Sequence, residues 1–231
     1  MRTIGLIGGM SWHSTASYYR IINETVAHRR GGHASAPIAL QSLDFATVRQ
    51  HQIDGDWTAA GDLLREAARK VVAGGADVVA ICTNLMHEVA PAVEGTVDVP
   101  LLHIADAVAA SPAANGWDRL GVLGARRVME DGFYTERLAR HGISAITPAA
   151  ADRELVDRVV FTELTRGQIR DDSRAAFVGV IERLAGQGAQ AVVLACTEIG
   201  LLVGDGDGPL PLIDSTDAHA RALAEFALAS R

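Results

Sequence analysis

The sequence predicts an α/β protein made of two pseudo-symmetric parallel-sheet domains, with the active site in the cleft between them. Short apolar runs alternate with longer segments of helical periodicity along the whole chain of 231 residues. This alternation is typical of α/β folds with a mostly parallel sheet. The second half also repeats the first. Ligands of open α/β sheets bind beyond the carboxyl ends of the strands, so two such halves predict a site between them.

Three pairs of similar segments carry the internal repeat, in the same order in both halves. We therefore expect one domain of residues 1–98 and 214–231 and a second domain of residues 99–213. The sequence offset between the halves falls slowly, from 116 through 113 to 111 residues. The pairs are GLIGG at 5–9 with GVLGA at 121–125, GADVVAICTN from Gly75 with GAQAVVLACTE from Gly188, and VPLLHIADA from Val99 with LPLIDSTDA from Leu210.

The first half should contain four strands, each followed by a helix. The run at 77–81 is continuously apolar, as expected of a parallel strand buried on both faces. The other strands are expected at 4–8, 37–42 and 99–102, and the helices at 15–28, 57–72, from 85 to about 91, and up to 110.

The second half should follow the same plan. Strands are expected at 120–124, 143–147, 191–194 and 210–213. Helices are expected at 129–140, twice between 152 and 185, and at 216–229.

Charge and hydropathy exclude several classes of function. The net charge is −7, and no Lys/Arg run exceeds two residues, whereas nucleic-acid binding calls for a basic stripe. No apolar run approaches the ~20 residues of a membrane span. The N-terminal MRTIGLIGGM is typical of a first strand rather than of a signal peptide. We therefore expect a cytoplasmic protein without nucleic-acid or membrane partners.

The residue inventory also argues against cofactors. Lys70 is the only lysine, and it falls in a helical pattern where it should be solvated, so Schiff-base chemistry with pyridoxal phosphate has one poor candidate. No His/Cys/Asp cluster has zinc-ligand spacing. GLIGGM lacks the G-x-G-x-x-G spacing of dinucleotide sites. We expect no cofactor and no metal.

Each half ends one apolar strand with a Cys-Thr pair. Cys-Thr-Asn occupies 82–84 and Cys-Thr-Glu occupies 196–198, and a helix is expected after each. A helix N-terminus could bind a carboxylate and lower the pKa of a cysteine. The alternative is that both cysteines are small buried hydrophobes, but their pseudo-symmetric placement favours a functional role.

The two cysteines are not at equivalent positions. Cys196 is eight residues after Gly188, and the residue eight after Gly75 is Thr83. Because successive side chains of a strand point to opposite faces, an ungapped register pairs Cys196 with Thr83 and turns Cys82 away. Pairing the two cysteines instead requires a bulge of one residue, so we favour Thr83.

At these motifs the sequence resembles the aspartate/glutamate racemase family, in its Cys-Thr-Asn branch. The resemblance implies a cofactor-independent amino-acid racemase that forms a homodimer. It also implies two residues, one per domain, that flank the substrate Cα and move protons on opposite faces. The matching segments are GLIGGMSWHSTASYYRIINETV at 5–26, ICTNLMHEVA at 81–90, LACTEIGLLV at 195–204, GFYTERL at 132–138 and HGISAITP at 141–148.

The resemblance assigns site residues on matching positions. Cys196 is the thiol of the second domain, and Thr83 holds the corresponding position in the first. The resemblance implies that five further residues line the site or contact the substrate, namely Met10, Ser11, Gln52, Asn84 and Thr197.

Several positions depart from the family pattern and leave the identity of the amino acid open. Leu85, Ala125 and Val128 stand where polar residues are usual. Arg126 or Arg127 could take over carboxylate binding, although a solvated pair is the simpler interpretation. His87 could reach the site, but we favour a satisfied surface histidine.

Two other functions remain open at this point. A one-thiol decarboxylase or isomerase of the same superfamily would need only one-sided proton delivery, which suits Thr83. A non-catalytic small-molecule-binding relative would suit the missing polar contacts, since a fold alone does not determine function.

Overall fold

The computed structural model describes residues 1–229, apart from the side chains of residues 112–115. The chain falls into two compact units, which we call unit 1 (Met1–Ile104 with His219–Arg231) and unit 2 (Ala105–Ala218). The boundaries expected from the sequence lie a few residues before these points. Whether either unit folds as an independent domain stays a prediction.

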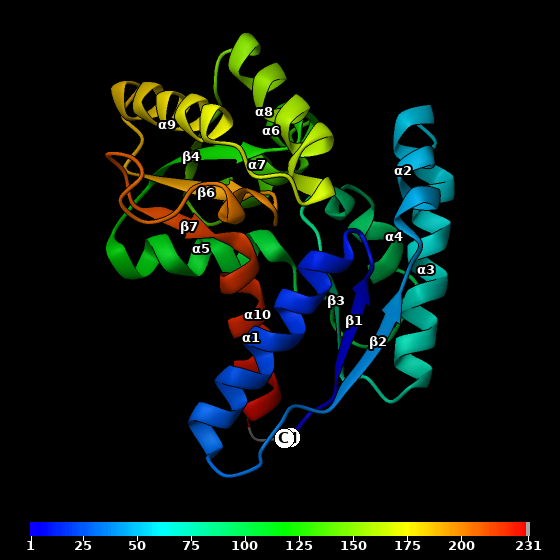
Figure 1. The fold of residues 1–231 in the computed structure, drawn as a ribbon. Coiled ribbons are helices and arrows are strands. Elements are labelled where there is room, and N and C mark those ends of the chain that lie inside the picture. Colours follow the sequence, from blue (N-terminus) through cyan, green and yellow to red (C-terminus); the bar gives the residue numbers. More distant parts are fainter. Residues whose placement is uncertain (230–231) are drawn as a thin grey trace. The chain divides into compact units, whose positions relative to one another are not determined.

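Unit 1 contains a three-stranded parallel sheet of order β2-β1-β3 (Figure 1). The helix α5 (Ile104–Asn115) begins where unit 1 ends, and α10 (Ser215–Leu228) brings the chain back. The remaining elements are β1 (Ile4–Gly8), α1 (Trp12–Arg30), β2 (Ile38–Ser42), α2 (Phe45–Asp54), α3 (Trp57–Ala73), β3 (Val78–Ile81), a 3₁₀ turn (Leu85–Val89) and α4 (Ala90–Glu94).

Capping residues explain where the helices of unit 1 begin and end. Asp44 and Asp56 cap α2 and α3, and the Asp56 carboxylate accepts the Ala59 N–H at 2.9 Å. These bonds satisfy amide groups that a helix start leaves without a partner. Gly55 ends α2 in the left-handed conformation, with φ of 71°, which glycine adopts without steric cost.

Alternate residues of β3 enter two separate parts of the core of unit 1. Val79 and Ile81 pack with residues of α3 and α4 on one face of the sheet. Val78, Ala80 and the following Cys82 pack with residues of α1 and α10 on the other face. The sheet is thus covered on both faces, as all-parallel sheets require.

Unit 2 contains a four-stranded parallel sheet of order β5-β4-β6-β7. Val192 and Leu194 of β6 pack against residues of α8 and α9, with Phe177 among the largest buried side chains. The elements are β4 (Arg119–Gly124), α6 (Arg126–Glu130), α7 (Phe133–Ala139), β5 (Ser144–Ile146), α8 (Ala150–Thr162), α9 (Asp171–Gly186), β6 (Ala191–Ala195) and β7 (Leu212–Asp214), with 3₁₀ turns at Leu164–Arg166 and Ile199–Leu201.

The strand registers confirm the internal repeat at the level of single residues. In unit 1, Val79 pairs with Gly5 on one side and bridges to Leu101 on the other. In unit 2, Val192 pairs with Gly121 and with Leu212. These are the residues that the three repeated segments make equivalent, so the prediction of two similar parallel-sheet α/β units is confirmed.

The elements differ from the expected ones in three places. The expected strand at 99–102 is reduced to the single Val79–Leu101 bridge. The helix α2 was not expected. The single helix expected at 129–140 is two helices, because Gly132 between them adopts a φ of 82° that ends regular helix.

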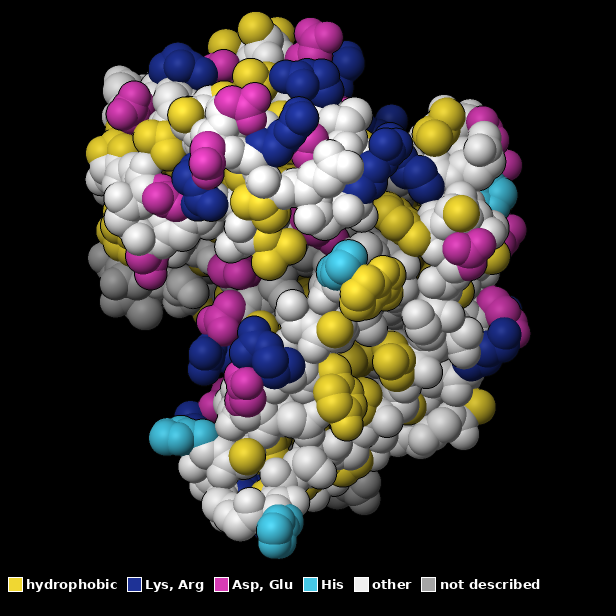
Figure 2. All heavy atoms as spheres, in the orientation of Figure 1, with side chains coloured by type: hydrophobic (Ala, Val, Ile, Leu, Met, Phe, Trp, Pro, Cys, Tyr) yellow, Lys and Arg dark blue, Asp and Glu magenta, His cyan; other side chains and the backbone are white. Residues whose placement is uncertain are grey.

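The surface of unit 1 carries exposed hydrophobic side chains, which gather over the region of α1 and β2 in Figure 2. The most exposed large ones in this region are Trp12 (64% exposed) and Tyr19 (56%) of α1 and Leu40 (46%) of β2. Among the described residues, no helix has both the length and the apolar character needed to cross a membrane.

Candidate functional site

The end of β3 places Thr83 and Cys82 in different surroundings. Cys82 is fully buried, and burial raises the pKa of its thiol. Thr83 is only partly buried. Because Val79 and Val192 hold equivalent register positions, counting four residues along each chain makes Thr83 equivalent to Cys196. The paired residues, up to Ile81 in unit 1 and its counterpart Leu194 in unit 2, thus follow the ungapped alignment.

The loop after β1 holds Met10 and Ser11 in a fixed, buried turn. The Gly9 N–H donates to Thr15 Oγ1 at 2.8 Å, and this hydroxyl donates to the Ser11 carbonyl at 2.9 Å. Gly9 has a φ of 88°, and a Cβ there would clash with the Leu43 carbonyl oxygen. Sequence reasoning missed Thr15, although a threonine in the first turn after a glycine loop is a recognisable signal.

Gln52 reaches from α2 to the 3₁₀ turn that follows β3. Its side-chain amide donates to Met86 Sδ at 3.1 Å, and its Oε1 accepts from Arg49 at 3.2 Å. Met86 packs in the same core cluster as Met10, and the nearby Asn84 is only 1% exposed. Unit 1 thus gathers its predicted site residues around the carboxyl ends of β1 and β3.

Unit 2 brings Cys196 and Thr197 to one buried carboxylate. The Thr197 hydroxyl donates to Glu198 Oε2 at 2.6 Å, and the Cys196 thiol donates to the same oxygen at 3.4 Å. Glu198 is 4% exposed. We did not single out Glu198 from the sequence, yet the contrast between Cys-Thr-Asn and Cys-Thr-Glu was the signal that could have found it.

The surroundings of Cys196 raise the pKa of its thiol well above the usual range. Protein atoms packed around the sulfur disfavour the anion most, and the negative charge of Glu198 adds to the effect. The helix N-terminus that we expected to lower this pKa is not there. The segments after the two Cys-Thr pairs are 3₁₀ turns, and the one after Cys196 is only three residues long, too short to align a helix dipole.

His87 is buried, so the surface-histidine interpretation was wrong. It is 2% exposed, and its Nδ1 lies 2.8 Å from the Thr83 carbonyl oxygen. Its Nε2 accepts the Ile104 N–H at 3.2 Å. Both ring nitrogens are engaged with backbone groups, so His87 has no lone pair left to act as a base on the Thr83 hydroxyl.

Two of the positions that depart from the family pattern are buried. Ala125 and Val128 are buried, at 5% and 0% exposure. Arg126 pairs with Glu130 at 3.0 Å and Arg127 with Asp131 at 2.7 Å. Both arginines thus lie in ion pairs one helical turn apart at the surface, which favours the solvated-pair interpretation over carboxylate binding.

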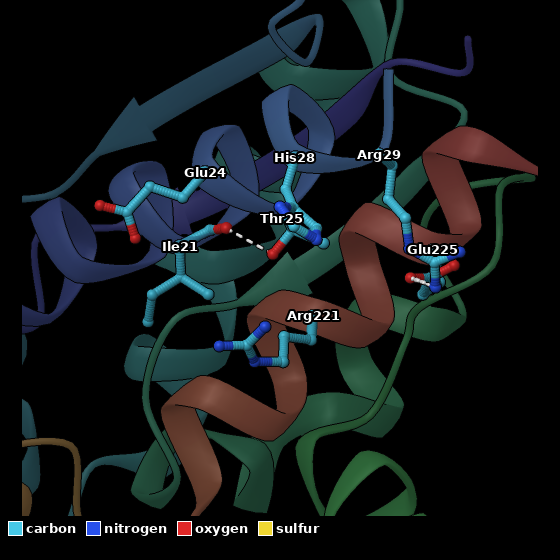
Figure 3. A pocket seen from close by; sticks show the side chains of 7 residues that line it. All are labelled: Ile21, Glu24, Thr25, His28, Arg29, Arg221 and Glu225. Atoms are coloured by element: carbon cyan, nitrogen blue, oxygen red, sulfur yellow. Dashed lines mark hydrogen bonds and ion pairs between the residues drawn. The ribbon is translucent and has the colours of Figure 1, made fainter. Parts of the chain in front are cut away.

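Two hollows within single units are lined by residues other than the predicted site residues. A groove of about 550 Å³ runs between α1 and α10 of unit 1, and Figure 3 shows the Arg29–Glu225 ion pair (2.6 Å) at one end of it. A hollow of about 370 Å³ in unit 2 includes Asp214 and Asp217. Neither groove contains Cys196, Thr83 or another predicted site residue.

Two observations on the described residues concern groups that could bind pyridoxal phosphate or a metal ion. Lys70 is exposed on α3, with its ammonium group 3.6 Å from Glu66, as the helical pattern predicted. Within residues 1–229 the structure groups no three His, Cys, Asp or Glu side chains in a way that could hold a metal ion.

Comparison with known proteins gives a consistent answer over nearly the whole chain. Residues 7–223 match the family described as Asp/Glu/Hydantoin racemase. A crystal structure from Yersinia pestis, described provisionally as an Asp/Glu racemase, is 48% identical, with a TM-score of 0.92 over 99% of this chain and 100% of that one. An aspartate racemase homologue from Pyrococcus horikoshii is 28% identical, with a TM-score of 0.85 over 99% and 100%. Picrophilus torridus aspartate racemase, at 19% identity and a TM-score of 0.79 over 98% and 94%, shows the fold alone.

Proposed function

Because the chain belongs to the Asp/Glu/hydantoin racemase family, we propose that it is an amino-acid racemase of the aspartate/glutamate type that needs no pyridoxal phosphate. Membership of this family supports a racemase-type function. The register equivalence of Thr83 and Cys196 carries the proposal. Each unit ends an equivalent strand with one side chain able to carry a proton, as an exchange of protons on two faces of one carbon requires.

The proposed reaction moves one proton off Cα and another onto it. The thiolate of Cys196 takes the α-proton of the substrate and becomes a thiol, and the Thr83 hydroxyl delivers a proton to the opposite face. A water molecule then reprotonates the Thr83 oxygen, and the Cys196 thiol loses its proton to solvent before the next turnover. The negative charge left on the substrate must be held by hydrogen-bond donors. We assign this task and substrate positioning to the residues named from the resemblance, Met10, Ser11, Gln52, Asn84 and Thr197.

The thiol must first ionise, and its neighbour supplies an acceptor. The Cys196 S–H points to Glu198 Oε2 at 3.4 Å, so we assign the thiol proton to this carboxylate. The pKa of Cys196 is raised, which means that the resting thiol is protonated and that the anion forms only as the reaction begins.

A threonine in place of a second thiol should make the two directions unequal. A threonine hydroxyl ionises far less readily than a thiol, and His87 is not available to it as a base. Thr83 can therefore return a proton but hardly remove one. By resemblance to the Cys-Thr-Asn branch we expect the L-enantiomer to be exchanged and the D-enantiomer to react slowly.

The test is Cα exchange in deuterated water. Purified protein is incubated with L- or D-forms of a panel of acidic and small polar amino acids, and NMR reports deuterium at Cα while chiral chromatography reports inversion. We expect exchange of an L-substrate that falls by about 10²–10⁴-fold in Cys196→Ser, because a serine hydroxyl cannot supply the anion. Thr83→Cys should bring the two directions closer.

The matched control for these variants is Cys82→Ala, which removes a thiol from the core without touching the strand-end position. It should leave exchange unchanged at a temperature where the variant is folded. If Cys82→Ala abolishes exchange while Cys196→Ser does not, the assignment of the thiol is wrong. Equal exchange of D- and L-substrate by the wild type would contradict the role of Thr83.

A second candidate function is a decarboxylase or isomerase with a single thiol. The observation that favours it is Thr83 itself, since one-sided proton delivery needs no second base. Absence of Cα exchange across the panel would favour this candidate, and absence of any turnover would favour a non-catalytic relative. The buried, apolar side chains of Ala125 and Val128 stand where the family usually has polar contacts, and a protein that only binds a small molecule could do without those contacts.

Two further assignments come from the sequence, the first of them through the resemblance. We propose a homodimer, for which light scattering should give twice the 24.4 kDa of one chain. We also propose a cytoplasmic location, where both cysteines would remain free thiols.

A further inference from the structure

Three histidines lie buried together in unit 1, beneath the strand end that carries Thr83. His87, His103 and His219 are 2%, 5% and 0% exposed. The His87 ring centroid lies 4.3 Å from that of His103 and 5.9 Å from that of His219. Tyr18 of α1 joins them, with its hydroxyl 2.7 Å from His219 Nδ1. Burial of so many polar rings needs a reason, because each must be fully hydrogen-bonded.

The hydrogen bonds fix the protonation state of His87. A backbone N–H can only donate, so the Ile104 N–H makes Nε2 of His87 an acceptor. A carbonyl can only accept, so the Thr83 carbonyl requires a proton on Nδ1. His87 is therefore neutral with the proton on Nδ1. A second proton would break the bond to Ile104, and the pKa of His87 is lowered by burial and by His103 and His219.

The same logic applies to His219. Its Nε2 must donate to the Leu102 carbonyl at 2.8 Å, and its Nδ1 lies 2.7 Å from the Tyr18 hydroxyl. Two histidines from separate elements thus hold the segment from Leu102 to Ile104. This segment is the stretch of chain in which unit 1 gives way to α5.

We propose that His87 is a positioning residue for Thr83. Its ring ties the Thr83 carbonyl to the Ile104 amide, and the Leu102–Ile104 segment is itself tied to His219 and Tyr18. The backbone that carries the Thr83 side chain is therefore anchored to the core of unit 1 by these hydrogen bonds. A side chain that returns a proton to one face of a carbon needs such a fixed origin, since misplacement by about 1 Å can cost ~10²-fold in rate. This role rests on the proposed function.

The test separates the two proton transfers. Exchange of an L-substrate with deuterium needs only Cys196, whereas inversion also needs Thr83, so the ratio of inversion to exchange reports on Thr83 alone. In His87→Leu we expect this ratio to fall by about tenfold or more, while exchange itself changes much less. A purely structural loss would lower both rates together and leave the ratio unchanged, which would overturn the proposal.

Two amide variants supply rescue and a safeguard against misfolding. The glutamine amide has N–H donors and an acceptor oxygen on a side chain long enough to serve both backbone groups, so His87→Gln should recover most of the ratio. His87→Asn has the same groups on a shorter chain and should not, and this pair carries the test if His87→Leu does not fold. The control His28→Leu changes an exposed histidine of α1 and should leave the ratio at the wild-type value.

Failure of this proposal is distinguishable from failure of the proposed function. Wild-type protein without Cα exchange of any amino acid overturns both. Wild-type protein that exchanges and inverts, with a ratio that is equal in His87→Asn and His87→Gln, overturns the role of His87 alone.

Discussion

At the residue scale, the surroundings of Cys196 should make the rate of Cα exchange depend on pH. Burial and the charge of Glu198 raise the pKa of the thiol, so the anion to which we assign removal of the α-proton becomes more abundant as pH rises. Exchange by the wild type should therefore increase from neutral to alkaline pH. The same raised pKa makes slow alkylation at neutral pH expected even of an active enzyme, so slow alkylation does not by itself indicate a binding protein.

Glu198→Gln should move the pH dependence of Cys196 ionisation to lower pH, while exchange loses the carboxylate that we assign to receive the thiol proton. The substitution keeps the shape of the side chain and removes the negative charge that disfavours the thiolate. The pH dependence of alkylation by iodoacetamide measures the midpoint directly, with Cys196→Ser as the variant that identifies the reacting thiol. A midpoint that stays at the wild-type pH would show that the carboxylate does not interact with the sulfur.

Buried His87 should lower the free energy of unfolding of the protein in mild acid. The pKa of His87 is lowered from its ordinary value of 6.5, so below that pH the unfolded chain binds a proton that the folded chain does not. The stability that neutral His87 contributes above pH 6.5 is thus lost as pH falls toward the lowered pKa of the folded state. One such group lowers the free energy of unfolding by up to about 1.4 kcal/mol per pH unit.

Urea unfolding at several pH values between about 7 and 5 measures this slope. His87→Gln should reduce the slope, because an amide does not titrate, and His28→Gln should keep it. His103 and His219 are the titratable groups that face His87 in this cluster. A slope that is unchanged in His87→Gln would contradict the prediction.

At the element scale, close packing of β4 against β6 positions the strand end that carries Cys196. A Cβ on Gly124 would lie 2.6 Å from the Ala195 carbonyl oxygen, and Ala195 immediately precedes Cys196. Gly124→Ala should therefore push the end of β6 away, at a cost of about 1–3 kcal/mol in unfolding free energy. Exchange should fall with it, since the thiol moves.

Gly186→Ala is the matched control for this substitution. Nothing lies within 4 Å of a Cβ at Gly186, the last residue of α9. Alanine there should be neutral or stabilise the helix by up to about 1 kcal/mol. Urea unfolding and deuterium exchange on both variants make the comparison, and equal stability of the two would show that β4 and β6 tolerate separation.

The elements also show what the sequence could and could not predict. The strands around Val79 and Val192 were predictable with their register, because the apolar runs and glycines repeat in both halves. The helix α2 was missed, since only Val48 of its residues is buried and its apolar periodicity is weak. The roles of His87 and Glu198 could not be read from the sequence, because they depend on burial and on contacts that spacing does not reveal.

At the scale of the whole molecule, one plan is used twice with different side chains. Each unit has a parallel sheet whose third strand ends in Cys-Thr, and the register equates Thr83 with Cys196. Around these positions the units differ. Neutral His87 holds the backbone at the first, and a carboxylate contacts the second. The repeat supplies the paired positions, and the differences around them suit opposite tasks, returning a proton and removing one.

The proposed proton transfers should need no metal ion and no pyridoxal phosphate. The only lysine, Lys70, is exposed on α3 and paired with Glu66, so the chain has no buried amine for a Schiff base. The described residues also group no three side chains that suit a metal ion. Exchange should therefore survive dialysis against a chelator, treatment with borohydride, and the substitution Lys70→Arg. Recovery of lost activity on addition of a metal ion or pyridoxal phosphate would show that the proton transfers need a group beyond these side chains.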